Sequence, residues 1–117
     1  MSRCTVIIAG RVDRQLIRHI RFLANVSLPA AKRFRKEYAE ILDRLEENPF
    51  QFPIDTDPNL PEGMYRKAVF ARCYKALFTV ENKIVYLDAV VDCRQSAARY
   101  PNAQQRRPFA DEREEQP

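Results

Sequence analysis

Positively charged side chains run through a strand-like segment in the second half of the chain. This segment, residues 65–95, reads YRKAVFARCYKALFTVENKIVYLDAVVDCRQ. Apolar residues supply one half of its alternation, which is typical of strands that bury one face. The cations project from the same strands or follow the last of them: Arg66, Lys67, Arg72, Lys75 and Arg94. Because a sheet holds such side chains in fixed geometry, the pattern indicates a surface that binds a polyanion.

The charge of the whole chain is distributed in blocks. Its 117 residues have a net charge of +4. Residues 1–36 hold nine Lys or Arg and one acidic residue, and residues 65–107 hold nine and three. The segment 37–64 between them holds one Arg and eight acidic residues, and 108–117 holds one cation and four acidic residues. Two basic blocks around an acidic one indicate a positive face, which suits a phosphate backbone or an acidic protein partner.

The N-terminal half reads as a strand followed by two helices. Residues 5–9 are rich in β-branched residues and predict a first strand that is buried on both faces. Over residues 12–26, apolar residues recur every three or four positions, which predicts an amphipathic helix. Ser27 and Pro29 then predict the start of a second helix that stops at Asn48-Pro49, and the short connection predicts an antiparallel helical hairpin.

The C-terminal half predicts a sheet. Four prolines between residues 49 and 61 predict a long ordered loop. Strands follow at about 64–71, 73–80 and 83–91, with a tight turn at Glu81-Asn82 between the last two. The order β-α-α-β-β-β predicts an α+β fold in which the hairpin packs on one face of a mostly antiparallel four-stranded sheet. We expect the other face to be partly open, one domain over 1–100, and a disordered tail over 101–117.

The composition argues against several other classes of protein. The apolar run at residues 6–9 is far shorter than the roughly 18 residues of a membrane span, and shorter than the apolar core of a signal peptide. We therefore expect a cytoplasmic protein with no membrane contact. Three widely spaced cysteines and a single histidine predict no metal site, and no motif predicts a cofactor.

Short motifs with a characteristic order extend over about residues 3–95. In the first half they are Arg21-Phe22-Leu23-Ala24, Ala30-Ala31, Leu45, Asn48-Pro49 and Phe52-Pro53. In the second half they are Tyr65-Arg66-Lys67, Tyr74-Lys75-Ala76-Leu77-Phe78 and Val91-Asp92-Cys93-Arg94-Gln95. No single motif is specific, but in their order and spacing they resemble the RelE/ParE superfamily of toxins from bacterial type II toxin–antitoxin systems.

The resemblance implies a small toxin that arrests growth and is held inactive by a cognate antitoxin. RelE-like members cut mRNA in the ribosome, which we take as the leading expectation. ParE-like members instead inhibit DNA gyrase without being enzymes, and a third alternative is an inactive member that still binds its antitoxin. For the antitoxin we expect a partner helix or strand that contacts exposed apolar residues of the helical hairpin, such as Phe22 and Phe34.

For RNA cleavage the resemblance implies four catalytic residues: Arg66, Lys75, Arg94 and Tyr100. Cutting RNA through its own 2′-OH needs a proton acceptor, cations that stabilise the phosphorane, and an acid for the leaving 5′-oxygen. No metal ion is needed for this reaction. The chain departs from the family pattern, because Lys75 stands where arginine is usual, Arg66 where lysine is common, and Ala68 at a second lysine position. Arginine is a poor base, so these departures weaken the assignment of a general base.

The same residues also have structural interpretations. The strand cations would then lie on a solvated face or form salt bridges with Asp88 and Asp92, and Tyr100 would be a packing residue. A catalytic histidine pair is excluded because His19 is the only histidine. We expect His19 on the surface of the first helix.

Overall fold

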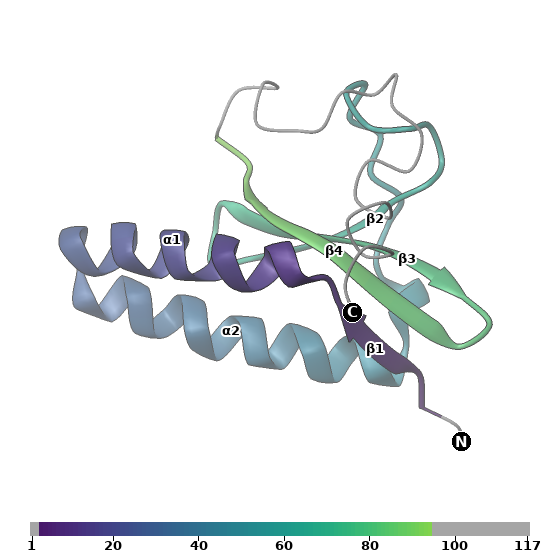
Figure 1. Cartoon of the computed structure of the whole chain (residues 1–117), viewed down its shortest axis with the longest axis horizontal. Coiled ribbons are helices and arrows are strands. Elements are labelled where there is room, and N and C mark those ends of the chain that lie inside the picture. The colour runs from purple at the N-terminus through teal and green to yellow at the C-terminus, as the bar shows by residue number, and fades with distance from the viewer. Residues whose placement is uncertain (1–2, 95–117) are drawn as a thin grey trace.

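A computed structural model describes residues 3–94 of the chain (Figure 1). Its elements are, in order, β1 (Thr5–Ile8), α1 (Gly10–Val26), α2 (Leu28–Glu47), the 3-10 helix η1 (Pro49–Gln51), β2 (Arg66–Phe70), β3 (Tyr74–Glu81) and β4 (Ile84–Asp92). The predicted α+β class and β-α-α-β-β-β order are confirmed. Tyr100 and the predicted tail over 101–117 lie outside the described residues.

The helical hairpin follows from one residue that ends a helix and begins the next. The Ser27 backbone N–H donates to Leu23 O at 2.7 Å, and its side-chain oxygen accepts from Ala30 N at 3.3 Å. Pro29 occupies the first turn of α2, where it gives up no helical hydrogen bond. Because α1 ends and α2 begins around this single residue, the helices run antiparallel and side by side (Figure 1).

The four strands form one sheet in the order β1-β4-β3-β2. β1 pairs with β4 in parallel, and the other two pairings are antiparallel. The turn between β3 and β4 consists of Asn82 and Lys83, both with positive φ (52° and 65°), one residue later than the predicted Glu81-Asn82. Positive φ at both central positions is the geometry of a tight hairpin turn, and asparagine tolerates it well.

The helices cover one face of the sheet with a single apolar cluster. Phe34 and Leu45 of α2 and Val12 of α1 pack there against Phe78 and Leu87. The opposite face was expected to be partly open, and it is covered only in part. Residues of the loop between η1 and β2 cover its centre, whereas Val69 of β2 on the same face is 53% exposed. The second cluster consists of Leu60, Tyr65, Leu77, Ala89 and Val91, with Met64 packed beside it.

The first strand was expected to be buried on both faces, which is wrong. β1 is an edge strand with β4 as its one neighbour in the sheet. Ile7 is 39% exposed and Ile8 is 40% exposed. β-branched composition reports the tendency to form a strand, whereas burial depends on which elements lie over that strand.

Candidate functional site

The predicted catalytic cations do not face one another. Arg66 pairs across β2 and β3 with Phe78, which belongs to the cluster under the helices. Lys75 lies two residues from Leu77, which belongs to the cluster on the far face. Because residues that pair across strands share a face and successive residues alternate, Arg66 and Lys75 project from opposite faces of the sheet.

Lys75 is enclosed in a buried ion pair. Its Nζ donates to Asp55 Oδ2 at 2.6 Å and lies 3.9 Å from Asp57 Oδ2. Only 7% of the Lys75 side chain and 2% of the Asp55 side chain are exposed. Sequence reasoning offered Asp88 and Asp92 as partners for the strand cations and missed Asp55, which lies in the proline-containing loop. The charge of Lys75 is therefore used to hold this loop against the sheet.

Arg66 also has structural partners. Its Nη1 donates to the backbone oxygen of Phe52 at 2.6 Å, and its guanidinium lies 5.0 Å from the centre of the Phe50 ring. The backbone next to it is paired as well, since Lys67 N donates to Pro53 O at 3.0 Å. These contacts fix the start of β2 against the segment that follows α2.

Arg94 follows β4 and pairs with Asp92, as one of the structural interpretations predicted. Its Nε and Nη2 donate to Oδ1 and Oδ2 of Asp92 at 3.0 and 2.8 Å, and its backbone N donates to Oδ1 at 2.9 Å. The hydrogen bonds from Arg94 hold the pKa of the Asp92 carboxyl below its ordinary value. The Arg94 side chain is 59% exposed while that of Asp92 is 6% exposed. Arg94 thus combines a fixed orientation with an accessible guanidinium.

The ends of the sheet separate Arg66 from Arg94. Arg66 pairs with Phe78, whereas Asp92, which holds Arg94, pairs with Tyr74. Tyr74 and Phe78 are four residues apart on β3, which corresponds to about 13 Å along the strand. Within residues 3–94, Arg66, Lys75 and Arg94 therefore form no common phosphate site, and the fourth predicted residue, Tyr100, lies outside the described residues.

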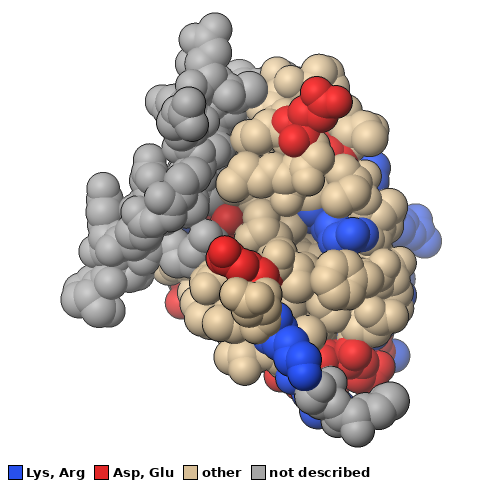
Figure 2. All heavy atoms as spheres, turned by 90° about the vertical axis from the view of Figure 1, so that its right-hand side faces the viewer, with Lys and Arg blue, Asp and Glu red and all other residues tan. Residues whose placement is uncertain are grey.

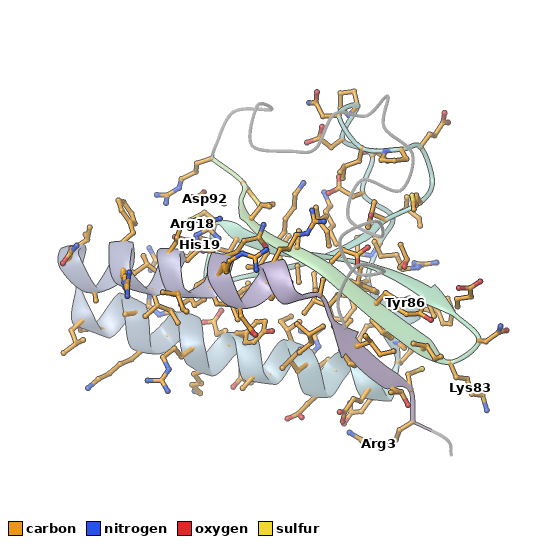
Figure 3. The ribbon with its side chains drawn as sticks, in the orientation of Figure 1. Arg3, Arg18, His19, Lys83, Tyr86 and Asp92 are labelled. Atoms are coloured by element: carbon orange, nitrogen blue, oxygen red, sulfur yellow. The ribbon has the colours of Figure 1, made fainter. Side chains whose placement is uncertain are left out.

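A different group of polar and aromatic side chains meets beside Asp92. Where α1 crosses the last part of β4, a surface cavity of about 280 Å³ is lined by Gln15, Arg18, His19, Phe22, Tyr74, Val90, Val91 and Asp92. Figure 3 shows Arg18 and His19 on α1 close to Asp92 at the end of β4. The Arg94 guanidinium is bonded to Asp92, which lines the cavity.

At the floor of this cavity, side chains of α1 make the hydrogen bonds to β4 that a neighbouring strand would otherwise make. β1 pairs with β4 only as far as Leu87, and Ala9 N donates to Leu87 O just beyond it. Further along, Gln15 Oε1 accepts from Val90 N at 2.8 Å, and His19 Nε2 lies 2.8 Å from Val90 O. Side chains four residues apart on a helix share a face, so one face of α1 satisfies both backbone groups of Val90.

The expectation that His19 is a helix-surface residue is therefore wrong. Its ring is half-buried, 4.9 Å from the ring of Tyr74 and 5.9 Å from that of Phe34 between centres. The spacing contained a signal for this position, because His19 lies three residues after Leu16 and four before Leu23, both of which pack on the core. Sequence reasoning overlooked it because it assigned the face from apolar residues alone.

The protonation states around the cavity follow from burial. Burial lowers the pKa of His19, while the hydrogen bond to Val90 and the charge of Asp92 oppose the shift. The imidazole is neutral near pH 7, and because Val90 O is an acceptor, Nε2 carries the proton and Nδ1 is the basic nitrogen. Burial raises the pKa of Tyr74. The cavity thus combines neutral aromatic rings with the guanidinium of Arg18, which suits an anion attached to a flat ring.

Of the two apolar residues expected to be exposed on the helical hairpin, one is exposed and one is buried. Phe22 is 56% exposed, but Phe34 is fully buried under α1 and β3. Further exposed apolar side chains lie where α1 meets α2, with Val26 69% and Leu28 58% exposed. Basic character is not uniform over the molecule. On the side that carries the β3–β4 turn, uncharged and acidic atoms separate the visible Lys and Arg atoms (Figure 2).

No family model matches this chain, and no curated protein matches it significantly. Among residues 3–94 no three or more His, Cys, Asp or Glu side chains are grouped closely enough to hold a metal ion. None of the helices described here is long and apolar enough to cross a membrane.

Proposed function

We propose that this chain is a toxin of the RelE/ParE kind from a bacterial type II toxin–antitoxin system. The observation that carries the proposal is the arrangement of elements, a helical hairpin on one face of a sheet ordered β1-β4-β3-β2. The motif Val91-Asp92-Cys93-Arg94 ends the central strand β4, and Arg94 lies exposed there. The protein acts in the cytoplasm and is held inactive by a cognate antitoxin.

The target we propose is RNA in translation, with the ribosome and its mRNA as partners. The support is local, since the exposed Arg94 lies beside a cavity with a second guanidinium, that of Arg18, and aromatic rings. Cations of this kind stabilise the charge that develops on a phosphate during cleavage by the neighbouring 2′-OH. Among the four residues first assigned, Arg94 retains this role and Tyr100 remains a candidate, whereas Lys75 lacks an accessible charge.

Inhibition of DNA gyrase by binding alone is the second candidate, and one observation favours it. Lys75 is neutralised by Asp55 in a buried pair, and Arg66 lies at the far end of the sheet from Arg94. The predicted cations Arg66, Lys75 and Arg94 therefore do not gather around one phosphate, as the family's cleavage mechanism would require. A non-enzymatic inhibitor needs no such arrangement.

The experiment that tests the proposal is induction of the chain alone in a bacterial host. We expect growth to stop, with amino-acid incorporation falling before DNA supercoiling changes and with new 5′ ends appearing within ribosome-covered mRNA. Loss of supercoiling with intact mRNA would establish the gyrase candidate instead. Continued growth would contradict toxicity, and copurification with the product of the neighbouring gene would then identify an inactive member that still binds its antitoxin.

A further inference from the structure

The cavity between α1 and β4 has no role in the catalytic assignment that the sequence suggested. We propose that it binds one nucleotide of a single-stranded RNA, with the base against the aromatic rings and a phosphate at Arg18. The inference rests on the proposed RNA target and adds the place where the chain holds its substrate.

The aromatic groups of the cavity suit a nucleobase. Phe22 lies at the border with 56% of its surface exposed, which leaves ring area available for stacking. Deeper in, the Tyr74 ring is only 1% exposed and holds the half-buried His19 ring in place, at 60° with centres 4.9 Å apart. Phe22 is therefore the ring that offers most of the stacking surface. Bases stack on such rings with little regard to sequence, because every base has a flat π face. A volume of about 280 Å³ is small for a ligand pocket and suits a single base with its sugar.

The charges around the cavity suit a phosphate. Arg18 lies one turn before Phe22 on α1, so the guanidinium and the ring share a face of the helix. Among the described residues, Asp92 is the one carboxylate that lines the cavity, and both of its oxygens accept from Arg94. An anion in the cavity therefore meets the exposed Arg18, while Arg94 neutralises the Asp92 carboxylate beside it.

An added peptide strand fits this place less well. A peptide that extends a sheet needs the N–H and C=O groups of the edge strand. At Val90 both groups are already bound, by Gln15 and His19 of α1. A ligand that contacts the aromatic rings and the arginine, without hydrogen bonds to the β4 backbone, is therefore favoured over an extended acidic peptide.

The test is binding of a short fluorescein-labelled oligouridylate to the purified chain, followed by fluorescence anisotropy without ribosomes. Phe22→Ala should raise Kd roughly tenfold, the effect of losing one base stack. Arg18→Ala should weaken binding and reduce the slope of log Kd against log salt by about 0.7, the share of one phosphate on a single strand. Matched controls on α1 are Ile17→Ala, which removes a half-exposed apolar side chain, and Arg21→Ala, which removes one charge. Neither lines the cavity.

Unchanged affinity in both controls, with unchanged thermal melting in all four variants, supports the site. Equal losses for Arg18→Ala and Arg21→Ala would instead mean general attraction to a basic helix and would overturn it. A polyglutamate peptide that displaces the RNA and itself depends on Phe22 would make this a site for an acidic protein. If the chain arrests growth and cleaves mRNA, but Phe22→Ala and Arg18→Ala leave RNA binding unchanged, the cavity site is wrong and the proposed function stands. If both variants weaken RNA binding as expected but the chain does not arrest growth, the proposed function is wrong and the binding site stands.

Discussion

Lys75 near the start of β3 and Asp55 in the loop before β2 form a 2.6 Å ion pair that is almost completely shielded from solvent. The pair joins the far face of the sheet to a loop that contains no regular strand. Backbone bonds support the same attachment, since Asp55 N donates to Tyr65 O at 2.8 Å. Lys75 is therefore a structural residue in the arrangement described here.

Breaking this pair from one side should destabilise the protein strongly. Lys75→Met leaves the Asp55 carboxylate buried without its cation, and we expect the free energy of unfolding to fall by about 3–5 kcal/mol. The double variant Lys75→Met/Asp55→Asn should recover part of the loss, because it leaves no buried charge. Chemical denaturation measures both. Lys36→Met, in the exposed Lys36–Glu40 pair, is the control and should cost about 0.5 kcal/mol or less. A similarly small effect of Lys75→Met would contradict the pair's structural role.

Stability should fall on mild acidification because of His19. Burial lowers its pKa in the folded state below the ordinary value of 6.5, so the unfolded chain takes up a proton first as the pH falls. The contribution is complete above about pH 6.5 and is lost as the pH falls toward the folded-state pKa. Denaturation curves at a series of pH values measure it.

The control for this prediction is His19→Gln, which retains a donor for Val90 O but does not titrate. Its unfolding free energy should vary less than that of the wild type between about pH 7 and about pH 5. Nearby charges act in both directions, since Asp92 favours the protonated imidazole and Arg18 opposes it. Identical pH profiles for the two proteins would show that burial of His19 does not control the dependence.

Arg94→Ala should reduce RNA cleavage by about 100-fold or more, the loss expected for one donor to the transition state. It also removes the partner of Asp92, whose pKa Arg94 holds below its ordinary value. The contribution of this shift to stability is present above about pH 3.8 and is lost at lower pH as the folded Asp92 takes up its proton. Arg94→Lys, with one charge but no fork, should recover less than full cleavage. Cleavage that survives Arg94→Ala would point to another surface or to gyrase.

Cleavage should require the 2′-OH of the RNA and not a metal ion. We expect cleavage by translating ribosomes to depend on a ribose at the cut position, because the attacking oxygen is its own 2′-hydroxyl. A single 2′-deoxy substitution there should abolish the cut, whereas the same substitution a few nucleotides away should not. Chelation of tightly bound transition metals, with magnesium kept high enough for the ribosomes, should leave the rate unchanged. Loss of activity on chelation, or cleavage at the deoxy position, would disprove this mechanism.

Local sequence determined the elements and their ends. Ser27 provides the cap between the helices, the apolar spacing of α1 and α2 sets their buried faces, and Asn82 permits the turn between β3 and β4. These features depend on neighbours within a few residues, where propensity and hydrogen bonding act directly. The β-α-α-β-β-β order and the α+β class follow from them.

Only the tertiary structure decided which cations are available and which residues form a site. Asp55 reaches Lys75 from 20 residues away because the loop folds over the sheet, and His19 reaches Val90 from 71 residues away because α1 crosses β4. Strand register also places Arg66 and Lys75 on opposite faces. Such contacts depend on how elements pack, and alternation within one strand carries no information about what covers each face. For that reason the sequence identified the cations of this protein, while packing determined that Arg94 is exposed and Lys75 is buried.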